Sequence, residues 1–383
     1  MKGFKNAEIY VEGKGIVRTN LAVENGKIVA IGDYVKVSEP FEIDEGAIVF
    51  PGFIDQHVHG AAGSDAMDGT KEDLNVIANA LAGEGTTSFL ATTMTQSTKN
   101  IVKALEAIGA YVKSDVSGGA RLLGAHLEGP FISEKFVGAQ PPEYVAKPSV
   151  ENFSVFEKAS GDTIKIVTLA VEKEGANELL EYFRSKGITP SIGHTSAKYA
   201  DVGEAICHGL KNVTHTYNAQ TPVHHREVGV VGAALLFDSL NCEIICDMIH
   251  LSAPAIKLVV KNKPHDKVTL ITDAMRAKHL PDGESELGGQ TVIVSGGEAR
   301  LKDGTLAGSV LKMNDAIKNV VLKAGVPLTD AVDFATINPA KNLGVDDLYG
   351  SIRVGKVADF AVLNEDFSVA CTIRDGEIVF KAR

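Results

Sequence analysis

Several histidines and one acidic residue of this chain stand at positions from which they could share a metal ion. His57 and His59 lie two residues apart in an apolar run, and alternate residues of a β-strand point to the same side. Glu128, in "HLEGP", ends another apolar run, where a carboxylate is costly to bury unless it is paired or metal-bound. His194 and His215 end two further runs. Such a set suits a borderline divalent ion such as zinc or ferrous iron, although each residue taken singly is also compatible with a structural role.

Two further acidic residues end apolar runs. A carboxylate next to a metal site can take a proton from water and pass it to a leaving group, which makes Asp273 in "ITDAM" a candidate general base and acid. Asp247 shares the end of its run with His250, and we expect it to support the site or the substrate loop. Structural pairing with a neighbouring cation is the alternative for Asp273.

A cationic loop follows the sixth of the apolar runs. His224, His225 and Arg226 lie between Pro and Gly residues in "NAQTPVHHREVG". The planar guanidinium of Arg226 is suited to binding a phosphate group. A solvated loop without a ligand is the alternative.

The residues that carry this chemistry follow eight short apolar runs, which alternate with amphipathic helical patterns. The runs are 47–59, 87–93, 122–129, 165–172, 189–195, 212–218, 242–250 and 268–274. This alternation is typical of βα units that build a parallel sheet. A closed (β/α)8 barrel would bring the run ends together at its mouth. A doubly wound open sheet is the alternative, but no G-x-G-x-x-G follows the first run.

The two ends of the chain have a different pattern, with apolar and polar residues alternating between Glu-Gly, Asn-Gly and Asp-Gly turn signals. We therefore predict an α/β protein with two parts. Residues 1–48 and 350–383 form a small β-sandwich domain, and residues 49–349 form the (β/α)8 TIM-like barrel. An inserted hairpin is expected after the eighth run.

Composition limits the classes of function. A formal net charge of -11 is unfavourable for binding nucleic acid or an anionic membrane. The four Cys contain no C-x-x-C pair, and the chain has neither a signal-peptide pattern nor an apolar stretch of membrane-spanning length. We expect a cytoplasmic protein with reduced thiols, and we expect Cys242 and Cys246 to be core residues.

The motifs together resemble the amidohydrolase superfamily, and within it the family of N-acetylglucosamine-6-phosphate deacetylases. The resemblance covers essentially the whole chain. It begins with "PGFIDQHVHG", which is common to the superfamily, and continues with "HLEGPF", "GHTSA", "THTYNAQTP", "ITDAM" and "LAGS" in that order. It implies a hydrolase that uses one or two divalent metal ions per subunit to release acetate from a small phosphorylated amino sugar. It also implies a homodimer.

The resemblance implies a role for each matching residue. Glu128, His194 and His215 would be the main metal ligands, while His57 and His59 would hold a second ion. Asp273 would be the general acid and base, and His250 would hydrogen-bond the acetyl carbonyl. The residues expected to line the sugar-phosphate pocket are Ala139, Gln140, Asn218, Ala219, Arg226, His250, Leu306, Ala307 and Gly308.

Three other functions remain open at this point. A deacetylase for N-acetylgalactosamine 6-phosphate differs only in the contact with one hydroxyl. A hydrolase of cyclic amides usually carries a carboxylated Lys at the end of strand four, but the fourth run here ends in Glu172 with Lys173 beyond it. A non-catalytic relative would typically have lost metal ligands, whereas the candidate ligands and Asp273 are all retained here.

Overall fold

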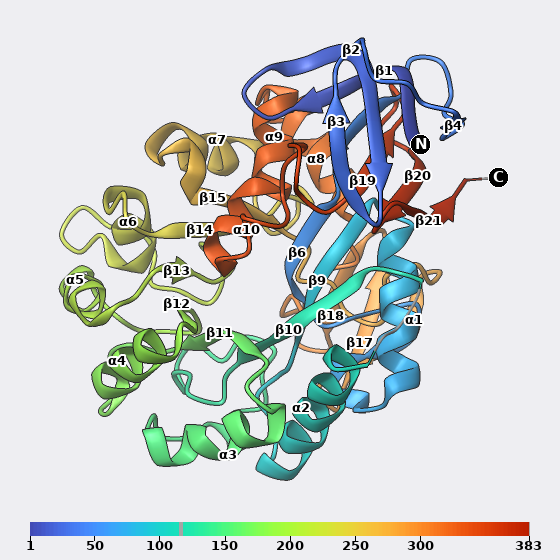
Figure 1. Ribbon diagram of the computed structural model, residues 1–383. Helices are drawn as coiled ribbons and strands as arrows, with labels where there is room; N and C mark the ends of the chain where they lie inside the picture. The colour runs from blue at the N-terminus through green and yellow to red at the C-terminus, as the bar shows by residue number, and fades with distance from the viewer. Residues whose placement is uncertain (115–117, 383) are drawn as a thin grey trace.

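Eight parallel strands form the central sheet, as the apolar runs predicted. In the computed structural model, which describes residues 1–114 and 118–382, they are hydrogen-bonded in sequence order (Figure 1). The strands are β6 (Phe53–Val58), β9 (Thr86–Thr92), β10 (Arg121–Glu128), β11 (Ile164–Leu169), β12 (Thr189–Ile192), β13 (Asn212–Val213), β14 (Asn241–Ile245) and β15 (Val268–Ile271). The first and last approach each other where Asp273 N donates to His57 O at 2.9 Å. The predicted (β/α)8 barrel is confirmed.

Helices surround this sheet in Figure 1 and bury their apolar faces against it. They are α1 (Lys71–Ala82), α2 (Thr98–Val112), α3 (Val150–Ser160), α4 (Ala176–Lys186), α5 (Tyr199–His208), α6 (Gly229–Leu236), α7 (Ala253–Asn262), α8 (Met313–Leu322), α9 (Leu328–Ala335) and α10 (Ile337–Leu343). Helix α1 illustrates the local cause. Thr70 caps its N-terminus by accepting from Asp73 N, and Leu74, Ile77 and Leu81 recur at helical spacing on its buried side.

Both ends of the chain contribute to a second sheet of eight strands, which has its own apolar core. Figure 1 shows the blue N-terminal and red C-terminal strands side by side. The strands are β1 (Lys2–Val11), β2 (Gly15–Glu24), β3 (Lys27–Ile31), β4 (Glu39–Pro40), β5 (Ile48–Pro51), β19 (Phe360–Leu363), β20 (Val369–Arg374) and β21 (Glu377–Lys381). The predicted run 47–59 is thus two strands, because β5 pairs with β1 and β19 while β6 enters the barrel.

The insertion after β15 is larger than the predicted hairpin. It is a three-stranded antiparallel sheet of β16 (Gly283–Leu287), β17 (Gln290–Ser295) and β18 (Glu298–Leu301). Its Leu287 packs with Met94 and Met275, which follow barrel strands β9 and β15. A small ribbon of β7 (Gly60–Ala61) and β8 (Ser64–Asp65) follows β6, and single 3-10 turns occupy Ala66–Asp68, Pro142–Tyr144 and His265–Lys267.

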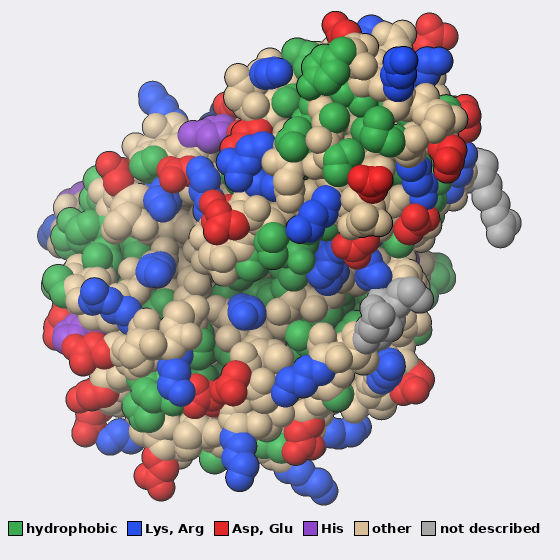
Figure 2. All heavy atoms as spheres, viewed as in Figure 1, with side chains coloured by type: hydrophobic (Ala, Val, Ile, Leu, Met, Phe, Trp, Pro, Cys, Tyr) green, Lys and Arg blue, Asp and Glu red, His purple; other side chains and the backbone are tan. Residues whose placement is uncertain are grey.

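The surface facing the viewer in Figure 2 carries Lys, Arg, Asp and Glu side chains that are interspersed. Within the described ranges, the helices lack the combination of length and apolar character that a membrane crossing requires. Cys242 and Cys246 are fully buried, so the prediction that they are core residues is confirmed.

Candidate metal centre and active site

The Glu128 carboxylate lies at the centre of the imidazoles that the sequence singled out. Its Oε1 is 3.2 Å from His194 Nε2 and 3.0 Å from His215 Nε2, and its Oε2 is 3.4 Å from His59 Nε2. His57 Nε2 lies 3.6 Å from Oε1. These five side chains come from four barrel strands and their following turns, and all are buried. The convergence predicted from the ends of the runs is therefore present in the fold.

These residues form two overlapping groups with the spacing of metal ligands. One contains His57, His59 and Glu128, and the other contains Glu128, His194 and His215. Within each group the candidate ligand atoms lie within 4.8 Å of one another. His57 Nε2 is buried and has no hydrogen-bond partner among the described residues, and such an orphaned nitrogen fits a cation ligand. The donor set of imidazoles and one carboxylate suits a divalent ion.

Backbone carbonyls orient two of the imidazoles toward the centre. Nδ1 of His59 donates to Thr92 O at 3.2 Å, and Nδ1 of His194 donates to Phe136 O at 2.9 Å. A carbonyl oxygen can only accept, so Nδ1 carries the proton in each ring. In the neutral tautomer, Nε2 then presents its lone pair to the site, as a metal ligand must.

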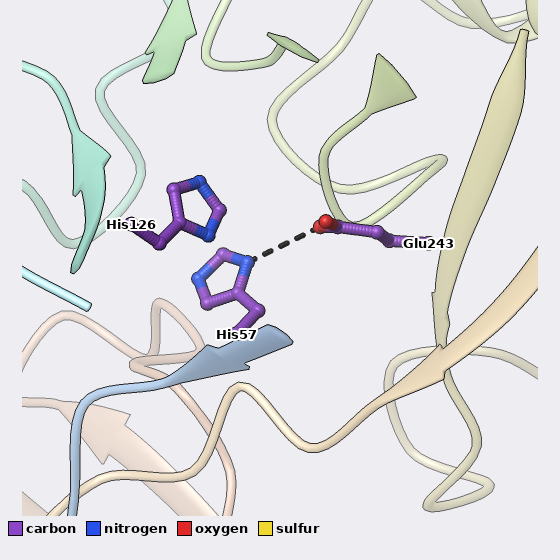
Figure 3. A group of neighbouring side chains, drawn as sticks. All are labelled: His57, His126 and Glu243. Carbon is purple, nitrogen blue, oxygen red and sulfur yellow. Dashed lines mark hydrogen bonds and ion pairs between the residues drawn. The ribbon is translucent and has the colours of Figure 1, made fainter. Parts of the chain in front are cut away.

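Glu243, which the sequence analysis did not select, contacts two of the candidate ligand residues from the barrel interior. Figure 3 shows its carboxylate directed at His57, with Oε2 3.3 Å from Nδ1. The same oxygen accepts from the backbone N of His215, while Oε1 accepts from Gln56 and Asn212. Glu243 is fully buried in β14. A charged residue inside the apolar run "CEIIC" was the available signal, because burying it requires partners.

His126 belongs to a third group with His57 and Glu243, but its own hydrogen bonds argue against a ligand role. Its Nδ1 lies 3.1 Å from Gln56 O and its Nε2 lies 2.7 Å from Thr168 Oγ1, so both ring nitrogens are engaged (Figure 3). Burial, together with the positive charge of a protonated His57, lowers its pKa to about 3. His126 is therefore a neutral, hydrogen-bonded part of the barrel interior.

Asp273 lies at the edge of the same cluster. Its Oδ1 is 3.3 Å from His57 Nε2 and 3.2 Å from His59 Nε2. Burial favours a raised pKa, but the two histidines outweigh it and hold the pKa of this carboxyl well below its usual range. The carboxylate form is thus the stable one in the site. Asp55 fixes the adjoining backbone, because its Oδ1 accepts from Thr272 N at 3.3 Å and its Oδ2 accepts from Thr272 Oγ1 at 2.5 Å.

Three of the site residues hold a left-handed backbone conformation. The φ angles are 47° for His194, 30° for His215 and 49° for Asp273. Such conformations cost on the order of 1–3 kcal/mol each and persist where the surrounding structure over-determines them. Each of these residues lies just after a barrel strand, where the turn directs its side chain inward. The sequence contains no signal for this, because no glycine occupies these positions.

A cavity of about 360 Å³ opens over these side chains. Of the pocket residues predicted from the resemblance, seven line it: Ala139, Gln140, Asn218, Ala219, His250, Leu306 and Gly308. Ala307 is fully buried and does not line the cavity. Arg226 does not line it either, since its side chain is exposed and its Nη1 lies 2.7 Å from His225 Nε2.

His250 is held at the cavity wall by Asp247. The two side chains are joined through Nδ1 and Oδ2 at 2.6 Å. Burial lowers the pKa of His250, but the Asp247 carboxylate outweighs it, so the net shift is upward. A raised pKa favours the imidazolium form, whose Nε2 carries a proton that it can donate.

Two lysines follow the C-terminal ends of barrel strands, but only one of the two lines the cavity. Lys135 lines the cavity and is the cation there that sequence analysis missed. Lys173, the candidate for a carboxylated lysine, does not line it. Its Nζ instead lies 2.7 Å from Glu134 Oε1 and 3.0 Å from Ile132 O. In the described structure, Lys173 therefore does not occupy the position of the carboxylated lysine that a cyclic-amide hydrolase of the usual type requires.

Comparisons with known proteins agree with this geometry. The amidohydrolase family model matches residues 48–379. An N-acetylglucosamine-6-phosphate deacetylase of Bacillus subtilis (strain 168) is 42% identical, over 98% of this chain and 96% of the relative. An N-acetylgalactosamine-6-phosphate deacetylase of Escherichia coli O157:H7 is 35% identical, over 91% of each chain. A variant of a deacetylase from Mycobacterium smegmatis, solved in complex with N-acetyl-D-glucosamine 6-phosphate, superposes with a TM-score of 0.91 at 28% identity, over 99% of each chain.

Proposed function

Because the chain belongs to the amidohydrolase family, in the branch of the amino-sugar-phosphate deacetylases, we propose that it hydrolyses N-acetyl-D-glucosamine 6-phosphate to D-glucosamine 6-phosphate and acetate. The observation that carries the proposal is the convergence of Glu128, His194 and His215 beside Asp273 at the base of one cavity. We further propose a cytoplasmic homodimer with one or two zinc or ferrous ions per subunit.

Each group in the site has a task in this reaction. A bound divalent cation would activate water and polarise the acetyl carbonyl. Asp273 takes the proton of the attacking water and gives it to the amide nitrogen, because an amine leaves poorly unless it is protonated. His250 donates a hydrogen bond from Nε2–H to the carbonyl oxygen as negative charge develops there. Asp247 keeps His250 charged and oriented.

The direct test combines two measurements on one sample. Metal content is determined by mass spectrometry, and acetate release is followed with N-acetylglucosamine 6-phosphate, its galactosamine epimer and the unphosphorylated sugar. We expect the glucosamine phosphate to have the highest kcat/KM. A preference for the galactosamine epimer would select the second candidate, which the 35% identical relative supports. Acetate release from none of the three would exclude both.

Removal of the Glu243 carboxylate should weaken metal binding. In Glu243→Gln, His57 Nδ1 and the His215 backbone lose their shared anion. Substitutions of such supporting groups cost about 10–100-fold in metal affinity, and we expect a loss of that size. Metal titration in the presence of a competing chelator measures it. Glu181→Gln, at an exposed position, serves as the control. An unchanged affinity in Glu243→Gln would show that Glu243 does not position the ligands.

The Asp247–His250 pair should set the alkaline limit of activity. The raised pKa keeps His250 protonated to higher pH, and activity is lost as pH rises through that pKa. Asp247→Asn removes the anion that raises the pKa, so the alkaline fall in kcat should move to lower pH. The kcat–pH profile tests this, with Asp238→Asn at an exposed site as control. The same profile in wild type and Asp247→Asn would contradict the assignment.

Two cations should contribute to phosphate recognition. Lys135 lines the cavity of its own chain, whereas Arg226 is exposed and lies outside that cavity. In the proposed homodimer, Arg226 would act on the phosphate bound by the second copy. A lost charge-assisted hydrogen bond costs about 1.5–3 kcal/mol, so Lys135→Ala and Arg226→Ala should each raise KM roughly 10–100-fold for the phosphorylated sugar. The kinetics of the unphosphorylated sugar, which lacks the phosphate, should not change. A KM unaltered by either substitution would remove that residue from the phosphate site.

A further inference from the structure

A second large cavity lies at the opposite end of the barrel from the catalytic one. It has a volume of about 610 Å³. Its wall includes Asn241, which opens β14, and Lys267, which directly precedes β15. Helix α10 contributes Asn338, Lys341 and Asn342. In Figure 1 this end of the barrel faces the viewer, with α10 in front of the strands.

The residues that line this cavity carry a net positive charge, whereas the net charge of the whole chain is negative. Four cations line it, Arg184, Lys211, Lys267 and Lys341, against the single carboxylate of Asp266. Lys267 lies 3.9 Å from Asp266. Within the described part of the chain, the other three cations have no ion-pair partner. Figure 2 shows Lys and Arg side chains around the centre of this face. In a protein of net charge -11, such a local excess favours an anion.

The asparagines on α10 supply fixed acceptors beside these cations. Asn338 donates from Nδ2 to His265 O and Val268 O, at 2.7 and 2.8 Å. Asn342 donates from Nδ2 to Gln56 Oε1 and Asn212 Oδ1. Each amide nitrogen is thereby engaged in hydrogen bonds within the protein, while each amide oxygen accepts no hydrogen bond from the described residues. Asn338 is 1% exposed, and its Oδ1 has no hydrogen-bond partner among the described residues. A buried acceptor without a donor is costly, and a hydroxyl group would satisfy it.

We propose that this cavity binds a small phosphorylated polyol, such as a hexose phosphate, at a site separate from the catalytic one. The phosphate would lie among the Lys and Arg side chains, which suit a dianion. Hydroxyl groups would donate to Asn342 Oδ1, and to the buried Asn338 Oδ1 once the atoms that cover it move aside. The volume exceeds that of the catalytic cavity, at about 610 against 360 Å³, so a molecule of the same size can enter.

The site connects directly to the metal centre. Asn241 donates to Asn212 Oδ1 at 2.6 Å, and Asn212 donates to Glu243 Oε1 at 2.9 Å. Glu243 in turn contacts His57. A ligand held at this end therefore lies a few hydrogen bonds away from a candidate metal ligand.

Isothermal titration with glucose 6-phosphate tests the proposal. The double variant Lys211→Glu/Lys341→Glu should bind one molecule fewer per chain than the wild type does, whether or not the catalytic cavity also takes this sugar phosphate. The matched double variant Lys14→Glu/Lys36→Glu, with the same charge change at exposed loop positions of the N-terminal segment, should bind as the wild type does. Acetate release should be unchanged in both double variants, and because the assignment rests on the difference in binding between them, a failure of the proposed reaction would not affect it.

Three results would overturn the proposal. No binding in the wild type would mean that the cations only complement the C-terminal ends of α4 and α5. An unchanged number of binding events in Lys211→Glu/Lys341→Glu would place the ligand elsewhere. The third result concerns inorganic phosphate, which we expect to bind this cavity several-fold more weakly than glucose 6-phosphate does. Equal affinity would identify a simple anion site without polyol recognition.

Discussion

Asp273→Asn is expected to bind metal normally and to lose about 10²–10⁴-fold in kcat, which is the range that a positioned general acid and base contributes. The amide has the size of the carboxylate but cannot accept a proton from water. His57 and His59 keep their other hydrogen bonds, to Glu243 and to Thr92 O, so the ligand geometry should survive. Acetate release measures kcat, and mass spectrometry measures bound metal.

The control for this variant is Asp347→Asn, which makes the same change at an exposed position. It should behave as the wild type does in both assays. If Asp273→Asn turned over at a near-normal rate, Asp273 would have no part in proton transfer. If it lost its metal as well as its activity, the carboxylate would be a ligand first, and its role in the chemistry would need a separate measurement.

Glu128→Gln should abolish both metal binding and turnover. Glu128 is shared by the two ligand groups, so one substitution removes the carboxylate from each. A neutral amide is a poor ligand for a divalent ion. The loss of metal affinity should therefore exceed the roughly 10–100-fold that supporting residues cost. Metal content after dialysis and acetate release at saturating substrate are the measurements.

A circular dichroism spectrum of Glu128→Gln distinguishes the loss of a metal ligand from the loss of the fold. Histidines now paired with Glu128 would lose their anion, and the pKa of His57, which Asp273 and Glu128 raise despite burial, should fall. We expect a folded, metal-free protein with a circular dichroism spectrum like that of the wild type. Glu178→Gln, on the exposed side of α4, is the matched control. Stoichiometric metal in Glu128→Gln would end the assignment of Glu128 as the central ligand.

Local patterns in the chain were sufficient to locate the barrel strands and the side chains that converge as candidate ligands. A parallel barrel strand is buried on both faces, so it is visible as a continuous apolar run, and a polar residue at its end is conspicuous. That reasoning found Glu128, His194, His215 and Asp273. The two-residue spacing of His57 and His59 needed no more than the geometry of a strand.

Other features depend on contacts between segments that are distant in the chain, and they could not be predicted from the sequence. Glu243 looked like one charge in an apolar run, and only the fold shows that it meets His57 and the His215 backbone. Lys135 and Arg226 are both cations on loops, yet only Lys135 lines the cavity of its own chain. The division of residues 47–59 between two sheets follows from pairing with β1 and β19, far away in the sequence.

The order of residues thus determined which side chains end each strand, because burial and strand periodicity are local properties. The tertiary structure decided which of those side chains meet, which tautomer their partners impose and which backbone turns direct them inward. These outcomes depend on neighbours that lie more than two hundred positions apart in the chain, such as Asp55 and Thr272, whose separation is 217 residues. No local pattern encodes a contact of that range.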